Sequence, residues 1–119
     1  MELVQYIIIN NSLGMNKGKI AAQACHASVL VLEKIDNLII NDWKSNGMKK
    51  IVLKIDSTDE LIKKFQFIKE KKLPVALITD AGKTQIAPGS KTCFACGPVD
   101  EKIGQVYFSD LKLLWFIKG

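Results

Sequence analysis

The sequence predicts an α/β fold, a three-layer α/β/α sandwich around a four-stranded mixed β-sheet. The chain has 119 residues, of which 48% are hydrophobic and 24% charged, and this composition is typical of a globular protein. Short apolar runs rich in β-branched residues alternate with segments of helical periodicity. Strands in this order, joined by right-handed crossovers, place helices on both faces of one sheet. We therefore expect residues 1–119 to form a single domain.

The first third of the chain predicts a strand and a long helix. The run Leu3–Ile9 is almost continuously apolar, as in a strand that is buried on both faces. A helical pattern occupies residues 16–35, and its small apolar residues are expected to pack on the sheet. The other face of this helix carries a row of Lys19, Gln23 and His26. We expect that row to face something polar.

The middle of the chain predicts a second strand and a further helix. Segment Asp36–Gly47 is less regular and has room for a short helix, whereas Lys50–Ile55 alternates as a strand does. Ser57 and Glu60 have the spacing of a capping box, so a helix begins there and ends before Pro74. Its lysines are interpreted as a solvated face in preference to an RNA contact.

The last third predicts two strands around an unusual loop. Val75–Thr79 is the third strand and Thr92–Gly97 the fourth. The connection between them, Asp80–Thr92, holds hydroxyls, two lysines and a carboxylate, and it is longer than a compact domain needs. The apolar tail, residues 110–118, suits a short helix or strand packed on the body, or a self-association surface.

Charge and hydropathy exclude several classes of function. Seventeen lysines and no arginine face 12 acidic residues, which gives a formal net charge of +5 and favours polyanions. Without guanidinium groups, contacts to nucleic acid are directed at phosphates, so sequence-specific DNA binding is not expected. No apolar run approaches the roughly 20 residues of a membrane span, and the N-terminus has no secretory signal pattern. We expect a cytoplasmic protein with no membrane partner.

The cysteines suit a reducing compartment. Cys25, Cys93 and Cys96 are too few and too unevenly placed for a disulfide framework. The C-x-x-C spacing of the last two is also found in redox and zinc sites. However, there is no second pair and His26 is the only histidine, so Cys and His cannot supply four zinc ligands within one subunit. We expect apolar strand cysteines, no metal and no cofactor.

Three side chains are candidates for chemistry. Lys19 falls in the first turn of its helix, where the helix dipole disfavours a cation, which favours a role beyond helix stability; an exposed lysine that serves solubility is the alternative. Asp80 follows a strand at the edge where open α/β sheets bind ligands, and a loop-capping role is the alternative. His26 is either a base or a hydrogen-bonded structural residue. Neighbouring Cys25 points about 100° away from it, so the two do not form a nucleophile–base pair.

Two long motifs and two short ones, in this order, resemble those of a known family: Gly18–Ala27, Thr79–Thr92, Gly97-Pro98 and Leu111–Leu113. Over residues 4–113 the chain resembles the archaeal and eukaryotic-type peptidyl-tRNA hydrolases. The resemblance implies a compact α/β sandwich, usually a homodimer, with no metal or organic cofactor. It also implies hydrolysis of the ester between a peptide and the terminal ribose of tRNA, which recycles tRNA from chains dropped by the ribosome.

The resemblance also assigns roles to single residues. The positions that match the family's functional residues are Lys19, Asp80, Thr84 and Thr92. The positions expected to contact substrate or tRNA are Gln23, His26, Lys17, Lys83 and Lys91.

We hypothesise that water attacks the ester carbonyl while Asp80 orients or deprotonates it and Lys19 stabilises the oxyanion. The two threonines would position water or substrate by hydrogen bonding. A covalent threonine intermediate is the alternative.

The chain departs from the family pattern at three places. Asn10-Asn11-Ser12-Leu13 stands where Arg-x-Asp-Leu is common, Lys83 stands where Arg is common, and Tyr107-Phe108 replaces a smaller turn. Two other classes of function stay open at this point. One is a non-catalytic RNA- or protein-binding adaptor on the same scaffold, and the other is a general esterase that cleaves simple amino-acid esters.

Overall fold

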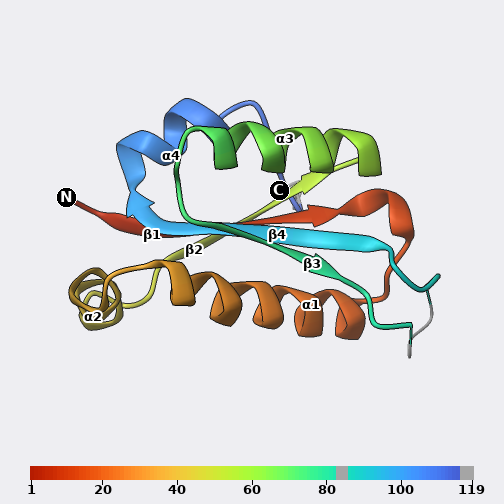
Figure 1. Cartoon of the computed structure of the whole chain (residues 1–119), viewed down its shortest axis with the longest axis horizontal. Helices are drawn as coiled ribbons and strands as arrows, with labels where there is room; N and C mark the ends of the chain where they lie inside the picture. Colours follow the sequence, from red (N-terminus) through yellow and green to blue (C-terminus); the bar gives the residue numbers. More distant parts are fainter. Residues whose placement is uncertain (83–85, 116–119) are drawn as a thin grey trace.

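The computed structural model describes residues 1–82 and 86–115. Figure 1 shows its mixed sheet and the helices around it. The strands are β1 (Leu3–Asn10), β2 (Lys50–Ile55), β3 (Val75–Thr79), β4 (Lys91–Asp100) and β5 (Lys112–Leu113). The α-helices are α1 (Lys17–Leu30), α2 (Asn37–Ser45), α3 (Thr58–Glu70) and α4 (Glu101–Phe108), and the 3₁₀ turns are η1 (Asn11–Leu13) and η2 (Val31–Lys34). No helix in the described ranges is long and apolar enough to cross a membrane.

The sheet has the strand order β3-β4-β1-β2-β5. β1 and β2 are parallel, and β4 runs antiparallel to both β1 and β3. The α/β class and the mixed sheet are confirmed, but the expected number of four strands was wrong, because the described residues form five. The additional strand, Lys112–Leu113, pairs antiparallel with Leu53 and Lys54 of β2. A strand of two residues is too short to show a periodicity in the sequence. It is recognised only from its pairing with the otherwise open edge of β2.

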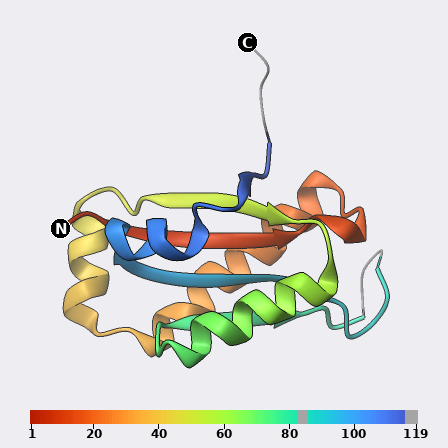
Figure 2. The same ribbon diagram turned by 90° about the horizontal axis from the view of Figure 1, so that it is seen from above.

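β1 is the centre of the core, as its apolar run predicted. Its side chains alternate between the two faces of the sheet. Val4, Tyr6 and Ile8 pack with residues of α3 and α4, and Ile7 and Ile9 pack with residues of α1. Figure 1 shows α3 and α4 over one face of the sheet and α1 over the other, and Figure 2 shows α3 near β3 and α4 near β1.

Helix α4 has no counterpart among the predicted elements. Tyr107-Phe108 was compared with a turn, but both residues belong to the end of this helix. The ring of Phe108 stacks on that of Tyr6 with 4.9 Å between the centroids. Gly104 allows α4 to pack closely on Tyr6, because a Cβ at that position would lie 2.1 Å from atoms of the Tyr6 side chain. The helix begins at a local cap, because the Asp100 side chain accepts from the N–H of Lys102 at 3.1 Å, and its packing on β1 fixes its position.

Element boundaries follow local capping where a cap exists. The side chain of Asn16 accepts a hydrogen bond from the N–H of Lys19 at 2.8 Å, so α1 begins as predicted. Ser57 accepts from the N–H of Glu60 at 3.2 Å and starts α3, also as predicted. Two expected boundaries were wrong. The helix expected over residues 16–35 is α-helical only to Leu30, and the last long strand extends to Asp100.

Candidate active site

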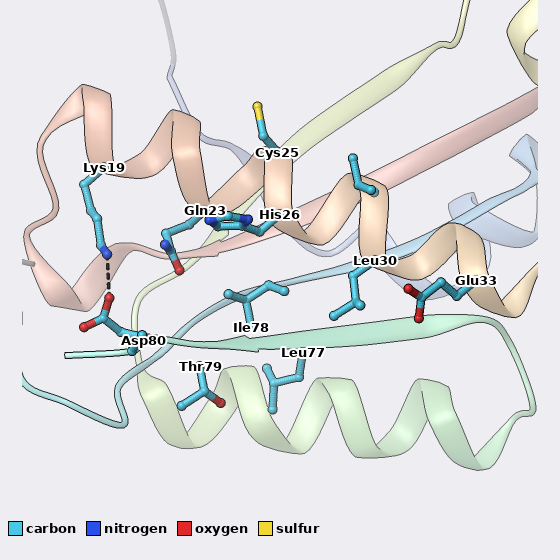
Figure 3. A pocket seen from close by; sticks show the side chains of 12 residues that line it. Lys19, Gln23, Cys25, His26, Leu30, Glu33, Leu77, Ile78, Thr79 and Asp80 are labelled. Atoms are coloured by element: carbon cyan, nitrogen blue, oxygen red, sulfur yellow. Dashed lines mark hydrogen bonds and ion pairs between the residues drawn. The ribbon is translucent and has the colours of Figure 1, made fainter. Parts of the chain in front are cut away.

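A cavity of about 790 Å³ lies between α1 and β3. Figure 3 shows its two walls, one from α1 and the other from β3 and the residues that follow it. Lys19, Gln23 and His26 line the α1 wall, so the predicted polar row does face a polar site. Asp80 lines the opposite wall, immediately after the last residue of β3. The cavity thus brings together four of the residues that the sequence singled out.

Lys19 and Asp80 form a buried ion pair. The Lys19 Nζ donates to Asp80 Oδ1 at 2.5 Å, and the two side chains are only 7% and 1% exposed (Figure 3). The N–H of Gly82 donates to the other carboxylate oxygen at 3.0 Å. A lysine in the first turn of a helix is unfavourable next to the helix dipole, and the Asp80 carboxylate supplies the opposite charge. The pair therefore fixes an ammonium group at one end of the cavity.

The inner face of α1 is polar at its N-terminal end. The buried residues of this helix are Lys19, Gln23 and Ala27, one turn apart. Only the small apolar residues of this helix were expected to pack against the sheet, and for this end of the helix that prediction was wrong. The physical reason is that the strands present polar partners here, Asp80 for the lysine and Thr92 for the glutamine.

Thr92 lies behind Gln23 and not in the cavity. Its hydroxyl is fully buried and donates to Gln23 Oε1 at 2.7 Å. Gln23 lines the cavity, and its Nε2 bonds to no other described residue. The contact therefore fixes the orientation of the glutamine amide, with its N–H donors left for a ligand.

The remaining site residues lie around the cavity or outside the described ranges. His26 is exposed on the cavity wall, and Lys17 is exposed at the start of α1. Lys91 is half-buried, and its Nζ donates to the Thr79 hydroxyl at 2.9 Å. Lys83 and Thr84 lie outside the described residues.

The three cysteines do not form a reactive centre. Figure 3 shows the Cys25 sulfur pointing away from Asp80, and Cys93 and Cys96 are buried on β4, as predicted for apolar strand residues. Burial raises the pKa of both buried thiols to about 12, so they are neutral at pH 7. Within residues 1–82 and 86–115, no group of three or more His, Cys, Asp or Glu side chains is placed to hold a metal ion.

Asn10 and Ser12 stand where Arg and Asp are common in the family that the chain resembles. The Ser12 hydroxyl donates to Asn10 Oδ1 at 2.5 Å. The Asn10 Nδ2 donates to the carbonyl oxygen of Lys91 at 2.9 Å and to the hydroxyl of Thr58 at 2.8 Å. Neutral hydrogen bonds thus join β1, β4 and the start of α3 at this departure from the family pattern.

Sequence reasoning missed the apolar part of the cavity. Val29 and Leu30 of α1 and Leu77 of β3 line it, and Val29 is 69% exposed. The sequence contains a signal for it, since Val29 and Leu30 are large apolar neighbours in a helix whose small apolar residues were expected to face the sheet. That these two residues face a sheet edge is known only from the strand order.

Comparison with known proteins gives a consistent result. Residues 3–114 match the model of a family described as peptidyl-tRNA hydrolase PTH2. The chain is 49% identical over 114 residues to a peptidyl-tRNA hydrolase of Methanococcus maripaludis, covering 92% of this chain and 97% of the relative. It is 44% identical over 111 residues to that of Methanothermobacter thermautotrophicus, covering 92% and 98%. It is 39% identical over 115 residues to that of Saccharolobus solfataricus, covering 91% and 96%.

Proposed function

The chain belongs to the peptidyl-tRNA hydrolase family PTH2 and is an enzyme that hydrolyses peptidyl-tRNA, and from this premise we propose that the ester is cleaved where Lys19 meets Asp80. The observation that carries the proposal is their buried 2.5 Å ion pair at the end of an open cavity. A charged pair removed from water interacts strongly with charge that develops beside it. Attack of water on an ester develops such charge on the carbonyl oxygen.

Lys19 stabilises the oxyanion of the tetrahedral intermediate. An ammonium group has three N–H donors, and within the described residues only Asp80 accepts from it. The ion pair holds the ammonium in place before the substrate arrives, so little reorganisation is needed in the transition state. Nearby, the Gln23 amide, oriented by Thr92, donates a further hydrogen bond to the acyl group of the substrate.

Asp80 orients the attacking water and receives its proton. The bond from the water oxygen to the carbonyl carbon forms, the bond from that carbon to the ribose oxygen breaks, and the proton passes to the ribose oxygen. Thr92 is a positioning residue, because its hydroxyl is fully buried and contacts Gln23. The role of Thr84 is proposed from the family motif, to hold water or substrate.

The tRNA lies along the basic residues next to this site. Lys17 and Lys91 flank the cavity from α1 and β4, and Lys83 belongs to the connection between β3 and β4. His26 adds a further contact to the substrate from the cavity wall. Because lysine contacts to phosphates release counterions, Lys17→Ala should raise KM more strongly at low salt than at high salt and leave kcat unchanged.

The test is release of free tRNA from N-acetyl-aminoacyl-tRNA, next to unblocked aminoacyl-tRNA, with and without EDTA. We expect the wild-type enzyme to cleave the blocked ester and to be indifferent to the chelator, and Asp80→Asn to lose the activity while remaining folded. Unchanged activity of Asp80→Asn would refute the assignment of the site. Cleavage of simple amino-acid esters at equal efficiency would favour a general esterase.

The proposal extends to a homodimer in the cytoplasm. All three cysteines are free and Cys25 is exposed, which suits a reducing compartment. Leu113 and Trp115 are exposed apolar residues at β5, on the edge of the sheet opposite β3. Trp115→Ser should therefore convert a dimer to a monomer in light scattering, whereas Val106→Ser, a change at an exposed apolar residue of α4, should not.

A further inference from the structure

β3 is one of the two edge strands of the sheet that the described residues form, and β5 is the other. The hydrogen-bond pattern of β3 is fixed by the N–H of Gly97, which donates to the carbonyl oxygen of Pro74 at 3.1 Å. Successive residues of an antiparallel strand direct their backbone groups alternately toward and away from the neighbouring strand. A register shift lies between Ile78 and Thr79, and beyond it the N–H of Asp80 donates to the carbonyl oxygen of Ser90 at 2.8 Å. The N–H and C=O groups of Val75, Leu77 and Thr79 therefore point away from β4.

At one end of β3 an outward carbonyl group is already hydrogen-bonded, whereas at the other end the outward backbone groups have no partner among the described residues. The Lys34 Nζ donates to the carbonyl oxygen of Val75 at 2.5 Å. In contrast, no other described residue bonds to the outward backbone groups of Leu77 and Thr79. These two residues line the same cavity as Lys19. An unpaired strand edge is a template for a further strand, and folded proteins commonly protect such edges.

We propose that the peptide part of peptidyl-tRNA binds as an additional strand along the open edge of β3, with its ester carbonyl at the Lys19–Asp80 pair. The inference rests on the proposed function, which places the ester at that pair. The ester is at the C-terminus of the peptide, and Asp80 directly follows the C-terminal end of β3. The added strand therefore runs parallel to β3.

The register follows from parallel pairing. In a parallel pair, one residue bonds to two residues of its neighbour that are two positions apart. One residue of the peptide donates its N–H to the carbonyl oxygen of Leu77 and accepts at its C=O from the N–H of Thr79. Two residues earlier in the peptide, a C=O accepts from the N–H of Leu77. The exposed side chains of Val29 and Leu30 cover the peptide from the α1 side.

This mode of binding suits the substrate class. Backbone pairing to a sheet edge gives affinity without reading side chains, and the apolar wall is too open to select one side chain. The peptides attached to tRNA differ in sequence from one molecule to the next, whereas their backbones are alike. The structure thus assigns recognition of the peptide to β3, separately from phosphate contacts to the tRNA.

The experiment compares substrates on one tRNA with the wild-type enzyme: N-acetyl-aminoacyl-tRNA, N-acetyl-tetrapeptidyl-tRNA, and tetrapeptidyl versions with a single N-methyl group at each internal amide in turn. We expect the tetrapeptide to raise kcat/KM roughly tenfold through its additional backbone hydrogen bonds. N-methylation at one amide should lower kcat/KM roughly 3- to 10-fold, because it removes the donor to Leu77. Methylation of the adjacent amides, which point away from β3, is the matched control and should have little effect.

An enzyme variant tests the same contact from the other side. Leu77→Pro removes one outward N–H, at an edge position where proline is tolerated. It should lower kcat/KM for the tetrapeptidyl substrate, whereas the exposed control Val106→Ser should match the wild type. If light scattering shows that Leu77→Pro dissociates a dimer, β3 is a subunit interface and the proposal is wrong.

The outcomes distinguish a failure of binding along β3 from a failure of the proposed function. If the wild-type enzyme cleaves every substrate with the same kcat/KM, whatever the length or methylation, then binding along β3 is refuted and the proposed function stands. If it cleaves none of them, including N-acetyl-aminoacyl-tRNA, the proposed function fails and this inference with it.

Discussion

Lys19→Met breaks the buried ion pair and should cost both stability and turnover. Breaking a buried pair by removing one partner costs about 3–5 kcal/mol, because the other charge stays buried without compensation. With side chains 7% and 1% exposed, this pair belongs to that class. The N–H of Gly82 still donates to Asp80, so we expect the lower end, about 3 kcal/mol. At about 4 °C per kcal/mol for a chain of this size, Tm falls by about 12 °C.

The effect on catalysis is expected to be larger than the effect on stability explains. Loss of one oxyanion donor lowers kcat by about 10²- to 10³-fold, and KM should change little because the contact forms in the transition state. The double variant with Lys19→Met and Asp80→Asn carries neither charge of the buried pair. It should therefore recover most of the lost Tm but none of the lost kcat.

The assays are thermal unfolding by circular dichroism and single-turnover release of tRNA from N-acetyl-aminoacyl-tRNA. Lys49→Met is the matched control, because it breaks an exposed pair with Glu2 and should change neither measurement. The reasoning is refuted if Lys19→Met keeps a kcat within about threefold of the wild type. It is also refuted if the double variant regains turnover together with stability, since Lys19 would then have only a structural role.

Three further predictions follow from single contacts. Thr92→Val should lower kcat about tenfold because the Gln23 amide on the cavity wall loses its partner, and Thr92→Ser should keep the wild-type kcat; equal loss in both variants would contradict a role for the hydroxyl. Gly104→Ala should destabilise the fold by about 1–3 kcal/mol in urea unfolding, since the new Cβ would overlap an aromatic ring, with kcat/KM unchanged per folded molecule. At pH 7 a thiol reagent should label Cys25 quickly and Cys93 and Cys96 only after denaturation. Because burial raises the pKa of the last two from 9.0 to about 12, unfolded thiols ionise first, so stability should fall as pH rises above about 9; a flat alkaline profile would contradict this.

Local signals were sufficient for most of the elements. The caps at Asn16 and Ser57 started their helices where predicted, because a side-chain oxygen and a backbone N–H three residues later interact whatever the rest of the chain does. The continuous apolar run Leu3–Ile9 correctly indicated a strand buried on both faces. In the same way, the unfavourable place of Lys19 beside a helix dipole identified it as unusual before any partner was known.

The sequence by itself determined the α/β class, the order of the main elements, the family, and Lys19 and Asp80 as candidates. Only the tertiary structure decided that these two residues, 61 positions apart, form one buried pair and that Thr92 acts on Gln23. It also decided the fifth strand, the packing of α4 and the open edge of β3. The physical reason is the sequence separation of the interactions involved. Periodicity and capping depend on neighbours within a few residues, whereas strand order and the exposure of a sheet edge depend on which distant segments pair.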